Sequence, residues 1–174
     1  MILLSILLIA LFAAGLGLAL AHLGMAADSP WLLAHISSAI AAYALFGAAV
    51  VCAWLFTRSE QRLRSHLSVA PRIPLLQLER WMFFCVFVGF VLLTLSLTVG
   101  TVAGGAGFLF KLQHKTMFAV IAWLTFATLL LGHWQLGWRG KQAVRMVHFG
   151  SIFLLLAYVG THFVLQFVLK RGGL

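Results

Sequence analysis

The stretch RWMFFCVFVGFVLLTLSLTVGTVA, residues 80–103, has no charged side chain after Arg80 and is long enough to cross a bilayer as a helix. Lipid offers no water to backbone groups, so such a segment satisfies them internally as an α-helix. The chain contains five segments of this kind: Ile2–Leu23, Trp31–Phe56, Arg80–Ala103, Thr116–Gln135 and Val144–Leu169. The sequence therefore predicts an all-α, polytopic membrane bundle of about five helices, a single domain over residues 1–174.

Charge is concentrated between these segments. Hydrophobic residues make up 63% of the chain, and 12 Lys and Arg against 3 Asp and Glu give a formal net charge of +9. Eight basic residues fall on one side of the predicted membrane: Arg58, Arg62, Arg64, Arg72, Arg80, Arg139, Lys141 and Arg145. Four fall on the other: Lys111, Lys115, Lys170 and Arg171. This bias predicts a cytoplasmic arginine-rich side, with the N-terminus inside and the C-terminus outside. We expect the basic side to contact anionic lipid headgroups rather than nucleic acid.

The connections carry helix-breaking residues. The inner connection Thr57–Glu79 is expected to be the longest polar loop, because two prolines interrupt it. Glu79 is expected to start the third helix, where its charge matches the macrodipole. The glycine-rich run Val99–Gly107 predicts that this helix ends there in a turn or loop. Residues Gly137–Lys141 predict a tight inner turn.

Four of the seven histidines lie near the outer ends of the predicted helices: His22, His35, His114 and His162. A single interfacial histidine is more often a hydrogen-bonded side chain than a ligand. A neutral imidazole near the end of a membrane helix is nevertheless a natural axial ligand for haem iron. The gathering of four on one side therefore indicates a haem-binding or metal-binding end of the bundle.

Within that group, His35 and His114 are the best candidates for a pair of axial ligands. His162 is the next candidate for the ligand opposite His35. Trp31, with Phe108 or Phe110, is expected to line the apolar slot, although aromatic residues at such positions are also interface anchors.

A second arrangement uses His148 and His162, which lie 14 residues apart in one predicted helix. They differ by roughly 40° in direction and by about 21 Å along the axis. Such spacing occurs in b-type di-haem electron-transfer proteins, although no partner helix here carries a matching pair. Catalytic patterns are absent: there are no paired carboxylates and no H-E-x-x-H, G-x-S-x-G or Walker motif. We therefore expect no enzymatic activity.

Several short motifs follow one another in a characteristic order. They are Ser29-Pro-Trp-Leu-Leu-Ala-His35 with Tyr43-Ala and Gly47, Leu78-Glu-Arg80, Gly89-Phe-Val-Leu-Leu-Thr94, Ala122-Trp-Leu-Thr-Phe126, Gly137-Trp-Arg-Gly-Lys141 and Leu156-Ala-Tyr158-Val-Gly160. The set resembles the membrane cytochrome c assembly proteins of the CcsA and CcmC type, and is most similar to the branch of YpjD-like and HemX-like proteins. The resemblance covers residues 29–169.

The resemblance implies a haem-handling protein of the bacterial inner membrane that binds haem b without a covalent bond. His35 matches the family's first outer-face haem histidine, and apocytochrome c or other membrane assembly subunits are the implied partners. Two family features are absent: the W-x-W-D outer loop, replaced by Gly100–His114, and an outer histidine after the last helix.

Two other functions stay open. One is a non-catalytic membrane scaffold or subunit of a larger complex, and the other is the di-haem electron-transfer protein. Members of the similar branch usually carry further helices before this region, so we expect the chain to be the tail of a longer protein.

Overall fold

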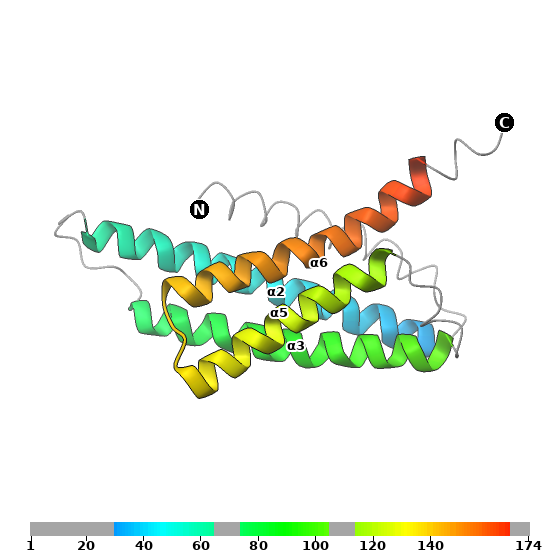
Figure 1. Ribbon diagram of the computed structural model, residues 1–174, viewed down its shortest axis with the longest axis horizontal. Helices are drawn as coiled ribbons and strands as arrows, with labels where there is room; N and C mark the ends of the chain where they lie inside the picture. The colour runs from blue at the N-terminus through cyan, green and yellow to red at the C-terminus, as the bar shows by residue number, and fades with distance from the viewer. Residues whose placement is uncertain (1–29, 65–73, 105–113, 168–174) are drawn as a thin grey trace.

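The computed structural model describes residues 30–64, 74–104 and 114–167, with side chains described over 33–64, 74–102 and 117–157 (Figure 1). These residues form four helices: α2 (Pro30–Arg64), α3 (Leu75–Gly104), α5 (His114–Leu136) and α6 (Lys141–Phe167). Consecutive helices run in opposite directions along the molecule. The predicted helix Ile2–Leu23 lies outside the described residues.

The prediction of an all-α membrane bundle is confirmed. Within the described part of the chain, three helices are long and apolar enough to cross a membrane: Leu33–Arg64, Leu75–Val102 and Met117–Leu136. The fifth predicted span, Val144–Leu169, corresponds to α6 (Lys141–Phe167), which is not among these three. The total of five spans stays a prediction.

Two antiparallel hairpins build the bundle. Helix α2 packs mainly on α3, and α5 packs mainly on α6, whereas α3 and α5 share a much smaller contact. The hairpins meet where the rings of Phe46 in α2 and Phe126 in α5 stack, with centroids 4.1 Å apart and planes 15° apart. Both rings are fully buried, so this stack marks the centre of the core.

Small residues allow α2 to approach α3 closely. Ala42, Ala49 and Ala53 recur at helical spacing on the buried face of α2. On α3, an added Cβ at Gly89 would lie 3.3 Å from the Phe46 ring. Lipid supplies no hydrophobic drive for helices to associate, so close packing of small residues is the main source of such contacts.

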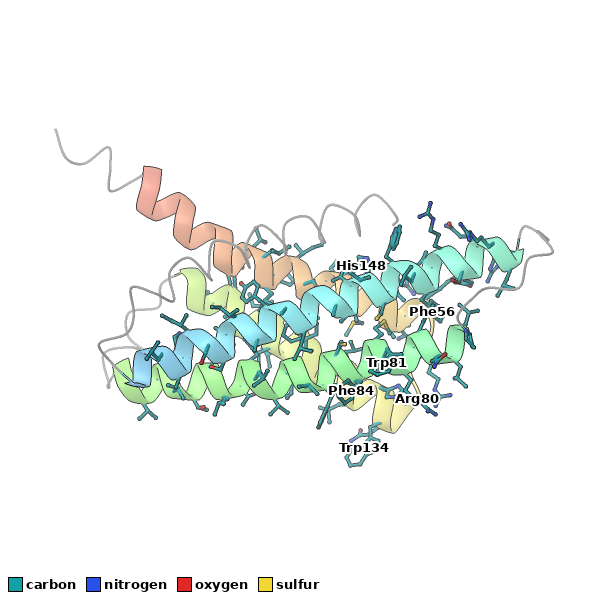
Figure 2. All side chains as sticks on the ribbon, turned by 180° about the vertical axis from the view of Figure 1, so that it is seen from behind. Phe56, Arg80, Trp81, Phe84, Trp134 and His148 are labelled. Atoms are coloured by element: carbon teal, nitrogen blue, oxygen red, sulfur yellow. The ribbon has the colours of Figure 1, made fainter. Side chains whose placement is uncertain are left out.

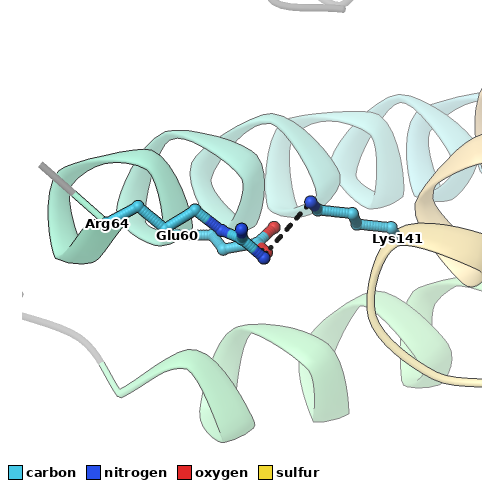
Figure 3. Close-up of polar contacts among 3 residues, drawn as sticks. All are labelled: Glu60, Arg64 and Lys141. Atoms are coloured by element: carbon cyan, nitrogen blue, oxygen red, sulfur yellow. Dashed lines mark hydrogen bonds and ion pairs between the residues drawn. The ribbon is translucent and has the colours of Figure 1, made fainter.

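The inner connection is shorter than the predicted loop Thr57–Glu79. Helix α2 continues to Arg64 and α3 already begins at Leu75, so both ends of that predicted loop are helical. No glycine or proline interrupts residues 57–64, and Glu60 accepts a hydrogen bond at 2.9 Å from the Arg64 guanidinium one turn later. Lys141 of α6 reaches the same carboxylate at 3.5 Å, which ties α6 to α2 (Figure 3).

The predicted break in Val99–Gly107 is also wrong over its first part. Helix α3 continues through this run to Gly104. The hydroxyls of Thr98 and Thr101 each donate to a backbone carbonyl three residues earlier, at 2.8 Å in both cases. Hydroxyls bonded inside the helix need no water, so polar and glycine residues are tolerated there.

The antiparallel order gives the bundle two chemically different ends. The basic end contains the end of α2, the start of α3 and the turn between α5 and α6, with the charged residues Arg58, Arg62, Arg64, Arg80, Arg139, Lys141 and Arg145. The opposite end, here called the His35 end, contains the starts of α2 and α5 and the ends of α3 and α6. The charge bias predicts that the basic end is cytoplasmic.

Candidate functional site

His35 forms a polar contact between α2 and α3 near the His35 end. Its Nδ1 lies 2.8 Å from the backbone carbonyl oxygen of Ser96 and 3.2 Å from the Ser96 hydroxyl. That hydroxyl in turn donates to the His35 carbonyl at 3.3 Å. Ser96 is buried, and His35 is half-buried. The imidazole is thus held by both the backbone and the side chain of one residue.

This geometry determines which ring nitrogen of His35 carries the proton. A carbonyl oxygen can only accept, so Nδ1 must be the donor in the 2.8 Å contact. In the neutral ring, Nε2 then carries the lone pair. Histidines that ligate metals almost always donate their other ring N–H to a carbonyl or carboxylate in this way. His35 therefore meets the chemical requirement for an axial ligand.

The other predicted site residues lie at the same end of the bundle. His114 is the first residue of α5, Trp31 is the second residue of α2, and His162 lies in the last third of α6. Their side chains are outside the described ones, as are all atoms of His22, Phe108 and Phe110. The fold therefore places these three helix ends at the same end of the bundle, and the convergence of the side chains stays a prediction.

A hydrogen bond across the core gives a reference point for the position of His162. The Tyr43 hydroxyl of α2 donates to the Leu154 carbonyl of α6. Counting outward from this bond, His35 lies eight residues along α2 and His162 eight residues along α6. At 1.5 Å per residue, each lies about 12 Å along its own helix axis from the residue that makes this bond. The backbones of α2 and α6 diverge toward this end (Figures 1 and 2).

A second bond gives a reference point for the position of His114. The Trp123 indole N–H of α5 donates to the Thr94 hydroxyl of α3 at 2.9 Å. His114 lies nine residues outward from Trp123, whereas Ser96 lies only two residues outward from Thr94. Counted along the two helices, His114 is therefore about 10 Å further outward from this bond than Ser96 is.

His148, half of the alternative di-haem pair, lies in a different environment. It is buried near the start of α6, and its Nδ1 donates to the Val144 carbonyl of its own helix at 2.7 Å. In the described part of the chain no three His, Cys, Asp or Glu side chains gather into a metal site. The two cysteines, Cys52 and Cys85, are free thiols within the helices.

A second polar cluster lies at the basic end, and the sequence interpretation missed it. The His133 ring stacks on Phe83 of α3, with centroids 3.7 Å apart. Its Nδ1 donates to the Trp138 carbonyl at 2.9 Å. The Gly140 N–H donates to a carboxylate oxygen of Glu79 at 3.0 Å. Glu79 thus ties α3 to the turn between α5 and α6, rather than serving the start of its own helix as predicted.

Two glycines in left-handed conformations shape this turn, as the sequence predicted. Gly137 and Gly140 have φ angles of 65° and 60°, which residues with a Cβ rarely adopt. Between them, Trp138 folds back so that its ring covers Gly132. The sequence signal for the cluster was therefore the glycine spacing around His133 and Trp138.

The family of the chain follows from its similarity to known proteins. The profile of a family described as "Cytochrome C assembly protein" matches residues 1–169. The chain belongs to this family. It is 31% identical over 144 residues to the inner membrane protein YpjD of Escherichia coli (strain K12). This match covers 80% of the chain and 54% of YpjD.

Two cytochrome c biogenesis proteins named CcsA are also similar. That of Heterosigma akashiwo (strain NIES-293 / 8280G21-1) is 32% identical over 92 residues, covering 52% of the chain and 29% of that protein. That of Prochlorococcus marinus (strain MIT 9215) is 26% identical over 160 residues, covering 78% of the chain and 52% of that protein. The chain spans about half or less of the length of these relatives. No solved structure matches it.

The family and the apolar helices confirm the predicted resemblance and location. The chain is a multi-pass protein of the bacterial inner membrane, related to YpjD-like and CcsA-like proteins.

Proposed function

We propose that the chain binds haem b without a covalent bond at the His35 end of the bundle and handles it during cytochrome c assembly. The observation that carries the proposal is the 2.8 Å contact between His35 Nδ1 and the Ser96 carbonyl. It holds the imidazole in the tautomer whose Nε2 can ligate iron. The family supplies the expected cargo, since relatives of this chain carry the name cytochrome c biogenesis protein.

His35 is the first axial ligand in this proposal, and the second comes from α5 or α6. Counted along its own helix, His162 lies as far outward from the Tyr43–Leu154 bond as His35 does. His114 lies further outward from the Trp123–Thr94 bond than Ser96 does, so we favour His162 as the second ligand. A porphyrin between two ligating helices needs more separation than directly packed helices have. The divergence of α2 and α6 toward this end is in the required direction. Trp31, in the first turn of α2, is the proposed aromatic wall.

The proposal includes no catalytic step for this chain. The described polar side chains at the His35 end are an imidazole and hydroxyls, with no carboxylate and no thiol among them. The axial imidazole holds the iron, and the apolar helix ends shield the porphyrin from water. Apocytochrome c or other membrane assembly subunits are the proposed recipients, and the whole chain acts as one membrane domain around residues 29–169.

Haem content of the purified protein tests the proposal. Protein from haem-replete cells is expected to show a Soret band and a pyridine haemochrome, and His35→Ala is expected to remove most of the haem. Ser96→Ala leaves the carbonyl bond to His35 in place and removes only the hydroxyl contacts. It is therefore expected to lower haem affinity by about tenfold, the low end of the range for partners that orient a ligating histidine.

Matched histidine variants separate the competing functions. His133→Ala at the basic end is the control and should retain haem. His114→Ala and His162→Ala identify the second ligand, and His148→Ala tests the di-haem arrangement together with the haem-to-protein ratio. Full haem content in His35→Ala would refute the proposed site. A stable membrane partner, with no haem in any preparation, would instead favour the scaffold function.

A further inference from the structure

The basic end contains an apolar groove that the haem proposal does not use. It lies between α3 and α5, where the two helices make little direct contact, and has a volume of about 810 Å³. Its walls are aromatic and aliphatic, with residues such as Phe84, Phe87 and Phe90 from α3 and Leu131 and Trp134 from α5. We call it the α3–α5 groove. His133 and Trp134 are the lining residues whose side chains carry a polar atom.

A smaller charged cavity of about 180 Å³ continues the groove toward the basic end. The two cavities share Phe83 and His133 as lining residues. Arg80 of α3 and Arg139 of the turn between α5 and α6 line the charged cavity and are exposed. Within the described residues, neither guanidinium has an ion-pair partner, since both ion pairs there use Glu60. The mouth of the groove therefore offers two cations to an incoming anion.

The one acidic group at this mouth is already engaged. Glu79 lines the charged cavity, and its carboxylate accepts the Gly140 N–H at 3.0 Å. The remaining titratable side chain, His133, donates through Nδ1 to the Trp138 carbonyl. Two arginines against one carboxylate leave the mouth with a net positive charge. The turn holds Arg139 in place, because His133 bonds to the backbone carbonyl of Trp138 before it and Glu79 to the backbone N–H of Gly140 after it.

The depth of the groove matches one lipid leaflet. Arg80 lies at its charged end and Phe90 at its deep end, ten residues apart on α3. At 1.5 Å per residue this distance is about 15 Å, half of a hydrocarbon core about 30 Å thick. Trp81 and Trp134, which are 54% and 87% exposed, lie close to the charged end. Figure 2 shows both on the same side of the molecule as Arg80 and Phe84. Exposed tryptophans typically mark the level of the headgroups.

We propose that the α3–α5 groove binds one anionic phospholipid of the leaflet at the basic end, with its phosphate between Arg80 and Arg139 and an acyl chain along Phe84, Phe87 and Phe90. Charge complementarity at the mouth selects an anionic headgroup over a zwitterionic one. The aromatic wall, about one leaflet deep, accommodates the chain. The site is at the opposite end of the bundle from His35, so it is independent of haem binding.

Native mass spectrometry of the purified full chain in an uncharged detergent tests this site. Phosphatidylglycerol and phosphatidylcholine with identical acyl chains are the two probes. Each arginine near a membrane surface contributes about 1 kcal/mol to the attraction of an anionic lipid, so the two together predict about a 30-fold preference for phosphatidylglycerol. One phosphatidylglycerol molecule per chain is expected to survive transfer to the gas phase.

Paired variants separate a built site from diffuse charge. Arg80→Gln with Arg139→Gln is expected to abolish the preference for phosphatidylglycerol. Arg62→Gln with Arg145→Gln removes the same amount of charge from the same end of the bundle but outside the groove, and should leave this preference intact. Ala127→Phe fills the groove without changing charge and should reduce lipid binding at least tenfold. Ala48→Phe, on an exposed face of α2, is its control.

Three results would overturn the proposal. The first is equal retention of the two lipids by the wild-type chain. The second is an equal loss of preference in the two arginine pairs. The third is unchanged phosphatidylglycerol binding in Ala127→Phe. This holds also where the variant loses bound haem or a second copy of the chain, because the groove would then hold that occupant and not a lipid. Helix content by circular dichroism, measured for each variant, ensures that a loss of lipid is read only from folded protein.

Discussion

Gly132 in α5 lies where one added methyl group should have a large effect. A Cβ at this position would lie 2.3 Å from Cε3 of Trp138, whereas carbon atoms pack at about 3.5–4.0 Å. The indole ring would therefore have to move by more than about 1 Å. That movement strains two hydrogen bonds, because the Trp138 N–H donates to the Gly132 carbonyl at 3.1 Å and the Trp138 carbonyl accepts from His133 at 2.9 Å.

Two opposing effects set the magnitude for Gly132→Ala. Alanine is a better helix former than glycine by about 1 kcal/mol. Overpacking a filled site typically costs about 1–3 kcal/mol, and each weakened hydrogen bond adds about 0.5–1.5 kcal/mol. The cost exceeds the gain, so we expect the free energy of unfolding to fall by about 1–3 kcal/mol. Because Arg139 follows Trp138 directly, the variant should also weaken the preference for phosphatidylglycerol.

Unfolding by SDS titration from mixed micelles, followed by far-ultraviolet circular dichroism, measures this change. Trp138→Leu provides the matched background, because it removes the ring that the new methyl group would strike. In that background Gly132→Ala should be neutral or stabilising by up to about 1 kcal/mol. A wild-type-like or more stable Gly132→Ala, with no coupling between the two substitutions, would refute the packing described for this turn.

Three further predictions use the same unfolding assay. Tyr43→Phe removes the hydroxyl bond to the Leu154 carbonyl and is expected to lower the free energy of unfolding by about 0.6–1.5 kcal/mol. A change below about 0.3 kcal/mol would show that this bond does not hold α2 to α6. Glu79→Ala leaves the Gly140 N–H without its carboxylate and should cost about 1–3 kcal/mol, whereas Glu79→Gln should retain part of the bond; equal losses in both would argue against it. Glu60→Gln removes both ion pairs at the surface of the basic end and should change the free energy of unfolding by less than about 1 kcal/mol. Added salt should diminish this effect, and a larger effect that salt does not change would contradict a surface contact.

The lengths of the helices were only partly predictable. The apolar segments were found correctly because lipid allows a backbone only one way to satisfy its hydrogen bonds. Residues 57–64 and 75–79 were assigned to a loop because the stretch between the apolar segments is largely polar and contains two prolines, yet they are helical. Polarity marks where the membrane ends, and a helix can continue past that level into water. Glycine density likewise misled the interpretation of residues 99–104, where threonine hydroxyls bond inside the helix.

The candidate sites show the same division between local and long-range information. His35 was identified from its position at a helix end and from the family motif around it. Its partner Ser96 lies 61 residues away and carries no special motif, so no local pattern could reveal the bond that sets its tautomer. The pairing of Glu79 with Gly140 also spans 61 residues. Such contacts depend on helix register, which hydropathy does not encode.

By itself, the sequence determined that this chain is a helical membrane protein, where its described candidate spans lie and where the tight turn falls. These properties follow from local composition, because the bilayer imposes the same length and polarity on every helix that crosses it. The tertiary structure alone decided which nitrogen of His35 is available, how Glu79 is bonded to the turn between α5 and α6, and where α3 and α5 leave a groove. Those features arise from how helices distant in sequence pack and slide against one another, so they exist only once the bundle is assembled.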